Sequence, residues 1–221
     1  MGNQLMIDVN GNGIPTLEIV VMMTIVALIP SILVMMTSFA RIIIILSFTR
    51  NAMGIQQVPP NMVMTGLALF LTLFIMSPVI GKVNQEAYIP YKNGTITQQE
   101  ALNRAQVPMK EFMLKQTEMG SLNLFMELSD IPEGSIQNYE DLPMTTVIPA
   151  FMTSEIKRGF LSGFLIFLPF LLIDIIVAST LMSMGMIMLP PATISLPFKI
   201  MLFVTVDGWG LLFSSIVKGF N

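Results

Sequence analysis

Residues 181–191 read LMSMGMIMLPP and place four methionines within seven residues, with a proline pair close behind. Two long apolar segments flank this stretch, at a place where a short polar loop would be usual in a membrane protein. Because methionine is unbranched and adaptable, it fills irregular gaps and packs against partners of varied shape. The stretch therefore predicts the tip of a hairpin, which acts either as a soft apolar seal or as a plain turn in a Met-rich chain.

The composition indicates a chain buried in lipid or in an oligomer. Of its 221 residues, 53% are hydrophobic and 11% are charged, whereas a soluble domain carries about 25% charged residues. The chain contains no cysteine and no histidine, which excludes thiol and histidine nucleophiles, thiolate or imidazole zinc sites and His-ligated haem. The net charge of -3 gives no basic footprint for nucleic acid. We expect no catalytic residues, no cofactor, no metal and no nucleic-acid partner.

Four apolar stretches predict an all-α fold built from two long, kinked helical hairpins. They cover residues 17–49, 62–81, 159–189 and 194–217, and a spanning helix needs about 20 apolar residues. The first pair turns at Gly54–Asn61 and the second pair turns within the methionine cluster. Each stretch contains a proline at which we expect a kink or break: Pro30, Pro78, Pro169 and Pro197. Such helices need close neighbours to satisfy the freed backbone groups, so packing against other subunits is expected.

Residues 83–155 are predicted to form a polar, partly helical, acidic extramembrane region within one domain that spans residues 1–221. This region holds ten acidic and four basic residues. Thr97 and Glu100 have the spacing of a capping box, in which the hydroxyl and the carboxylate satisfy free amides at a helix start. Residues 129–149 combine three prolines with four carboxylates and are expected to be an irregular loop.

Two further predictions concern the helix that follows the capping box. Pro108 is expected at the first position of a new helix, where its missing amide costs nothing. Glu111 and Lys115 have the spacing and order of a favourable ion pair on one helix face.

Four charged residues lie in apolar surroundings, where charges usually pair or line a polar path: Arg41, Asp174, Lys199 and Asp207. If the second hairpin turns between residues 186 and 187, residues whose numbers sum to 373 lie level across it. Asp174 and Lys199 meet this condition, so we predict an ion pair. It either fixes the register of the hairpin or relays protons, and register is favoured because a neighbouring lysine keeps a carboxylate ionised. Asp207 either caps a helix break or faces a partner.

Five long blocks of the sequence carry a family resemblance. They read FARIIIILSFTRNAMG (39–54), QQVPPNMVMTGLALFLTLFIMSPV (56–79), SEIKRGF (154–160), FLPFLLIDIIVAST (167–180) and GMIMLPPATISLPFKIMLFVTVDGW (185–209). They resemble the FliP family, the P subunits of the bacterial flagellar type III protein export gate. The resemblance runs from about residue 14 to the C-terminus and is weakest in 83–145.

The resemblance implies an oligomeric subunit of an export gate in the bacterial inner (cell) membrane, at the flagellar basal body. Several copies would assemble with FliQ-type and FliR-type subunits and with an FlhB-type subunit. Unfolded flagellar proteins would pass through a central pore that a methionine-rich loop closes like a gasket. The acidic region would then lie outside the cytoplasm.

Carried to this chain, the resemblance gives the gasket to Met186, Ile187 and Met188, with Met184 beside them. Ile187 departs from the consecutive methionines that are common in the family, and its β-branched side chain is stiffer. Asp174 and Lys199 match the charged pair of the family.

Two alternatives remain at this point. The first is the homologous subunit of a virulence type III secretion system (the SctR group), which shares the same blocks. The second is an ion or solute carrier that uses Arg41, Asp174 and Lys199 as relay groups.

Overall fold

The computed structural model describes residues 6–9, 12–55, 57–131, 138–186 and 188–220. Its elements are β1 (Met6–Val9), β2 (Asn12–Pro15), α1 (Thr16–Met35), α2 (Phe39–Ala52), α3 (Asn61–Val83), a π-helical turn (Asn84–Tyr88), α4 (Ile89–Lys92), α5 (Gln98–Gln116), α6 (Met119–Leu128), a 3₁₀ turn (Tyr139–Asp141), α7 (Met144–Ser183), α8 (Pro191–Thr205) and α9 (Gly208–Lys218). The predicted helical class is confirmed. The strands β1 and β2 form a short antiparallel ribbon ahead of the helices, which the sequence analysis did not foresee.

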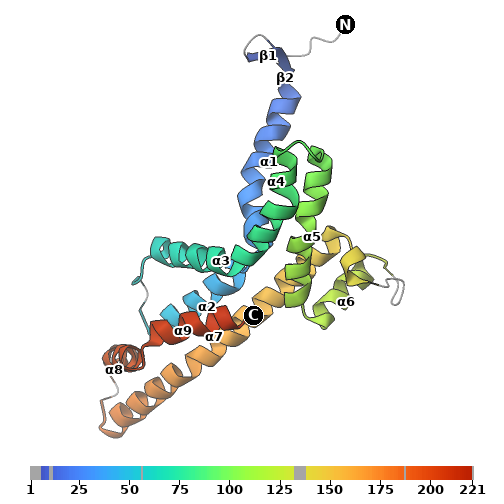
Figure 1. Ribbon diagram of the computed structural model, residues 1–221. Coiled ribbons are helices and arrows are strands. Elements are labelled where there is room, and N and C mark those ends of the chain that lie inside the picture. The colour runs from blue at the N-terminus through green and yellow to red at the C-terminus, as the bar shows by residue number, and fades with distance from the viewer. Residues whose placement is uncertain (1–5, 10–11, 56, 132–137, 187, 221) are drawn as a thin grey trace.

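The first apolar stretch breaks at Met36–Ser38, whereas the sequence analysis placed the break at Pro30, which lies inside α1. The hydroxyl of Thr37 donates a hydrogen bond to the carbonyl of Val34 and accepts one from the amide of Phe39. Serine and threonine side chains compete in this way with the helical backbone bonds. The first hairpin therefore consists of α2 and α3, and α1 extends away from it with the β-ribbon at its far end (Figure 1).

The second apolar stretch forms one helix that is longer than predicted. With the π turn and α4 it runs from Asn61 to Lys92, and it is one of two helices in the described residues that are long and apolar enough to cross a membrane. The other is α7, whose 40 residues correspond to about 60 Å at 1.5 Å per residue, twice the hydrocarbon thickness of a bilayer.

One boundary of the polar region and the break in the last apolar stretch differ from the predictions. The irregular loop ends at Pro143, because α7 begins at Met144 and carries Pro149 within its first turns. The last apolar stretch is divided into α8 and α9 by a 63° bend, which lies at Val206–Asp207 and not at Pro197.

Half of the predicted capping box at the start of α5 is confirmed: the Thr97 hydroxyl accepts a hydrogen bond from the amide of Glu100. The Glu100 carboxylate binds Arg104 instead of a free amide. The placement of Pro108 was wrong: it lies buried inside α5, which continues to Gln116. The expected partner of Glu111 was also wrong. Its carboxylate forms an ion pair with Lys82 of α3 at 3.0 Å and not with Lys115. The ion pair therefore connects α3 to α5 instead of lying along one face of α5.

The core lies where α2 packs along α7, and two glycines of α7 bring the helices close together. A Cβ atom at Gly159 would lie 3.1 Å from Ile44, and one at Gly163 would lie 2.4 Å from the Phe48 ring. Small residues allow helix backbones to approach in this way. A cluster of buried apolar side chains extends this core from α2 to α3 and α9. Its members include Ile42, Ile45, Leu46, Met64, Ala68, Leu212 and Ile216.

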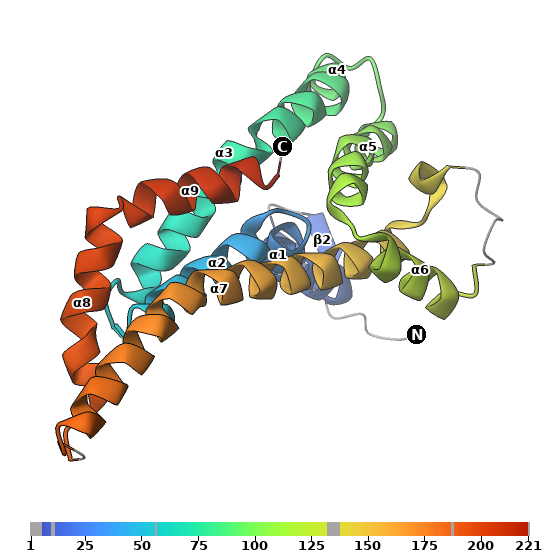
Figure 2. The same cartoon turned by 90° about the horizontal axis from the view of Figure 1, so that it is seen from below.

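The long helix α7 separates the two ends of the molecule. Its first turns lie beside α5 and α6, and its last turns reach the α7–α8 tip at the opposite end, as both views show (Figure 1, Figure 2). The helices α8 and α9 fold back along α7, and α3 lies on the same side (Figure 2). One continuous helix therefore connects the polar region with the methionine cluster.

We predict that Gly163→Ala destabilises the chain by about 1–3 kcal/mol, because the added methyl group would overlap the Phe48 ring. The measurement is the unfolding transition of the detergent-solubilised protein. Gly66→Ala is the matched control, since a Cβ atom there meets nothing within 4 Å. Equal transitions for the two variants would contradict the close α2–α7 contact.

Candidate functional site

The end of α7 is a turn that presents the methionine cluster. The amide of Gly185 binds the carbonyl of Met182 and the amide of Met186 binds the carbonyl of Leu181, both at 3.0 Å. With Gly185 at φ +74°, this is a Schellman motif, in which a left-handed glycine closes the helix and reverses the chain. Pro191 then occupies the first turn of α8, where proline is well tolerated.

The described methionines of this turn point outward. Met184, Met186 and Met188 are 67%, 40% and 98% exposed. Ile187, the fourth predicted gasket residue, lies outside the described residues. Large apolar side chains gathered on an exposed tip are a feature of surfaces that bind a partner.

Below the tip, the structure brings Asp174 and Lys199 together. The lysine Nζ lies 2.6 Å from Oδ2 of Asp174, and the hydroxyl of Ser195 donates to Oδ1 at 2.6 Å. The Lys199 side chain is 7% exposed and that of Asp174 is 31% exposed. Two donors from α8 therefore hold one carboxylate from α7, which sets the register of the hairpin at the level that the residue numbers predicted.

Arg41 is the centre of a second buried polar cluster, which joins segments far apart in the chain. Its guanidinium forms a two-pronged ion pair with the carboxylate of Glu155 on α7. It also donates to the side chain of Gln116 and to the carbonyl of Gly219, both at 3.2 Å. Its central carbon lies 3.8 Å from the centroid of the Phe220 ring. The cluster thus fixes α2, α5, α7 and the C-terminal residues to one another.

Arg41 was predicted from the sequence as a charge in apolar surroundings, whereas its partner Glu155 was not. Glu155 lies in the SEIKRGF block, where a carboxylate stands at the edge of a long apolar run, and this was the one available signal. Its neighbour Lys157 binds Glu118 at 2.6 Å. The hydrogen bond from Lys157 is the main cause that lowers the pKa of the Glu118 carboxyl.

Asp207 stands at the bend between α8 and α9. Its backbone has φ +51° and ψ +53°, and its side chain makes no capping hydrogen bond. The bend depends on the next residue, because a Cβ atom at Gly208 would lie 2.4 Å from the ring of Phe203. Asp207 thus occupies the N-cap position of α9 at the break, as one of its two predicted roles requires, but without a side-chain capping bond, and its carboxylate is exposed.

Across the part of the chain that the structure describes, no group of three or more Asp, Glu, His or Cys residues could hold a metal ion. Among the residues whose burial the structure describes, the buried charges are Arg41, Glu155 and Lys199, and each has an opposite charge as its partner. The buried charged groups are therefore held in ion pairs, and the candidate binding feature on the surface is the exposed methionine tip.

The chain matches the model of the FliP family over residues 22–216. The chain belongs to the FliP family. It is 52% identical over 205 residues to the flagellar biosynthetic protein FliP of Pectobacterium carotovorum, covering 93% of this chain and 79% of that protein. It is 50% identical over 207 residues to the Bacillus subtilis protein of the same name, and the match covers 93% of this chain and 92% of that protein. Against that of Aquifex aeolicus it is 47% identical over 211 residues, covering 96% and 88%.

FliP membership makes the chain a flagellar biosynthetic protein of the export apparatus. These relatives carry the flagellar name, and the flagellar assignment therefore replaces the virulence alternative. Membership and the long apolar helices together indicate association with a membrane.

We predict that Asp174→Ala harms stability more than Lys199→Ala. Removing Asp174 leaves a buried ammonium without its counter-charge, which costs about 3 kcal/mol, the lower end for buried pairs. Removing Lys199 leaves a partly exposed carboxylate that keeps the Ser195 hydroxyl, at a cost of about 1–2 kcal/mol. Unfolding transitions of the two single variants and of the charge swap measure this. If both single variants unfold at the same point as the wild-type protein, the ion pair has no structural role.

We also predict that Glu155→Gln lowers the free energy of unfolding by about 3–5 kcal/mol, because the buried guanidinium of Arg41 loses its counter-charge. Glu100→Gln is the matched control. Its carboxylate pairs with Arg104 on an exposed helix face, and such pairs contribute about 0.3–0.5 kcal/mol. If both variants unfold at the same denaturant concentration, the cluster around Arg41 does not stabilise the fold.

Proposed function

We propose that this FliP-family chain is a pore-forming core subunit of the flagellar type III export gate and that its methionine tip is the gasket of the pore. Several copies, with FliQ-type, FliR-type and FlhB-type subunits, surround a channel through which unfolded flagellar proteins cross the bacterial inner membrane at the basal body. The subunit has no catalytic activity of its own.

The observation that carries this proposal is the exposed tip itself. Three thioether side chains project from the end of a helical hairpin, and the Asp174–Lys199 pair holds that hairpin in register below them. An extended chain presents every kind of side chain to the pore that it crosses. A ring of adaptable methionines can close around such a substrate, and an apolar constriction without a substrate resists ions by losing its water.

The exposed apolar surface supports assembly with other subunits. Nine large apolar side chains on α7 between Phe160 and Ile176 are at least 40% exposed, and monomeric soluble proteins rarely leave such continuous surfaces uncovered. They are Phe160, Leu161, Phe164, Leu165, Leu168, Leu171, Leu172, Ile175 and Ile176. They span about 24 Å along α7, a length that one bilayer or a neighbouring subunit can cover, and the proposal assigns this surface to a neighbouring subunit.

The carrier alternative has less support. A relay group needs freedom to exchange protons or ions, whereas Arg41 and Lys199 are each held by a carboxylate. An enzyme is likewise not expected, since the chain has no histidine or cysteine. The acidic region at residues 83–155 is proposed to lie outside the cytoplasm.

Replacing Met186 and Met188 with glycine tests the gasket. Without the thioethers the constriction cannot close, so we expect ion leak across the membrane to rise in cells that express the variant. The measurement is growth and membrane potential under ionic load, together with the amount of flagellar protein exported.

Met119→Gly is the matched control, because this methionine is exposed on α6 and far from the tip (Figure 2). A tight membrane in the Met186→Gly/Met188→Gly variant, with normal assembly of the gate, would refute the gasket. A leak of equal size in the Met119→Gly control would refute it as well.

A further inference from the structure

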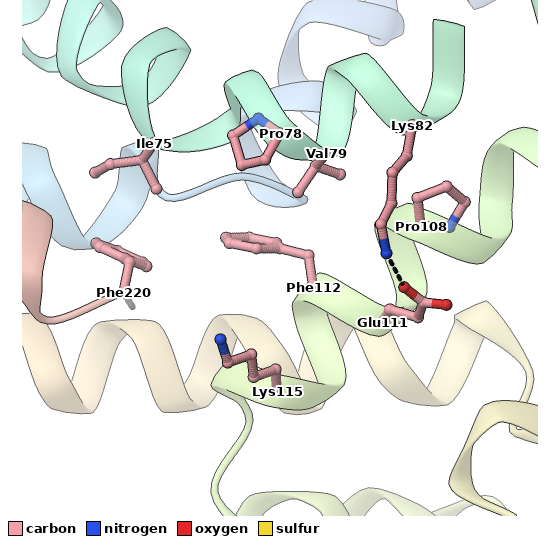
Figure 3. Close-up of a pocket in the computed structure, with 9 residues that line it drawn as sticks. All are labelled: Ile75, Pro78, Val79, Lys82, Pro108, Glu111, Phe112, Lys115 and Phe220. Atoms are coloured by element: carbon pink, nitrogen blue, oxygen red, sulfur yellow. Dashed lines mark hydrogen bonds and ion pairs between the residues drawn. The ribbon is translucent and has the colours of Figure 1, made fainter. Parts of the chain in front are cut away.

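The methionines of the described residues differ widely in their access to water. The α7–α8 tip gathers four exposed methionines within seven residues: Met182, Met184, Met186 and Met188. Five others are buried in the helical cores: Met53, Met64, Met76, Met113 and Met126. The cavity between α3 and α5 opens no path to the buried group, because its described lining residues include no methionine (Figure 3). A reagent dissolved in water thus meets a concentrated group of thioethers at the tip and not in the cores.

Thioethers are the groups of this chain that oxygen-transfer oxidants attack most readily, because the chain has no cysteine. With hypochlorous acid, the sulfur gives up an electron pair and binds the oxygen atom. The O–Cl bond breaks, chlorine is reduced to chloride, and the hydroxyl proton passes to water. The product is a sulfoxide, which is polar. Methionine sulfoxide reductases reverse the step: a dithiol is oxidised to a disulfide, and the sulfoxide oxygen leaves as water.

The tip can be oxidised without losing its backbone structure. Its turn is held by backbone hydrogen bonds from the amides of Gly185 and Met186, and its hairpin is held by the Asp174–Lys199 ion pair. None of these contacts uses a sulfur atom. Oxidation therefore changes the polarity of the tip and leaves its position. An apolar constriction excludes ions only while its lining repels water, and a sulfoxide oxygen needs hydrogen-bond donors that water supplies.

We propose that Met184, Met186 and Met188 form a modification site for hypochlorous acid and related oxygen-transfer oxidants, and that their sulfoxides open the closed gate to ions until they are reduced. This inference rests on the gasket of the proposed function. Because the tip borders the conduit in that gate, an oxidant dissolved in the water of the conduit reaches it. Each copy contributes the same residues, so one sulfoxide per copy places several polar groups at one level of the constriction.

The first measurement locates the sulfoxides. Native membranes that contain the assembled gate are treated with increasing amounts of hypochlorous acid, and the digested chain is analysed by mass spectrometry. Met184 and Met188 should gain one oxygen atom at amounts that leave the buried Met64 and Met113 as thioethers, because susceptibility follows exposure. Thioethers that persist at the tip while the buried residues oxidise, or oxidation to the same extent at all four positions, would overturn the proposal.

The second measurement is the ion leak of the same membranes. The leak of the wild-type gate should rise with sulfoxide at the tip and return to its starting value after treatment with reductase and a dithiol. This reversal requires no variant, so it does not depend on the folding of one. A leak that persists after the tip has been reduced would show damage elsewhere and would contradict the proposal.

Matched variants test the same point. Met184→Leu/Met186→Leu/Met188→Leu keeps apolar side chains of similar volume that cannot form sulfoxides, so its membranes should stay tight at every amount of oxidant. Met119→Leu removes an exposed methionine on α6, far from the tip (Figure 2), and should leak as the wild type does. Equal leaks of the triple variant and the wild type under oxidant would overturn the proposal.

The Met186→Gly/Met188→Gly variant, measured without oxidant, separates this inference from the gasket itself. If that variant leaks while wild-type gates with sulfoxides at the tip stay tight, the gasket stands and the oxidation switch is wrong. If both stay tight in assembled gates, the gasket and the switch are both wrong. A leak in both, with reversal by the reductase, is the expected result.

Discussion

The bidentate pair between Arg41 and Glu155 is the interaction on which the arrangement of the helices depends. It is buried, and its guanidinium also reaches Gln116 and the carbonyl of Gly219. Four segments that are far apart in the sequence therefore meet at one charge. A buried pair adds little net stability compared with apolar packing, but any arrangement that separates the partners is strongly destabilised, because it leaves a buried charge without its counter-charge. In a chain whose surfaces are mostly apolar, and thus poorly specific, this kind of contact selects one packing.

The same logic applies at a smaller scale to the second hairpin. Leucine and isoleucine side chains on α7 and α8 could pack in several registers with similar energies. Asp174 accepts from both Lys199 and Ser195, and these two bonds favour the observed register over the others. The polar groups of this protein thus determine which apolar faces meet, and the apolar faces supply the contact area.

Sequence reasoning reached the contacts that lie within one hairpin and missed those between hairpins. Asp174 and Lys199 were predictable because a hairpin makes the sum of facing residue numbers constant. Arg41 and Glu155 are 114 residues apart, and no local rule joins them. The helix breaks were also misplaced. Prolines such as Pro30 and Pro108 stay inside helices, whereas the breaks occur at Thr37 and Asp207, where a side-chain hydrogen bond or a left-handed backbone replaces the helical pattern.

The unbroken length of α7 has a mechanical meaning. One end of this rod is embedded among α5 and α6, and the other end carries the Schellman turn. Because α7 is buried against its neighbours as far as Phe170, its last 13 residues form an arm of about 20 Å, and a tilt of about 15° there moves the far end by about 5 Å, roughly the width of a thioether side chain. Small rearrangements where α7 leaves its neighbours would thus displace the methionine tip, which is the proposed gasket.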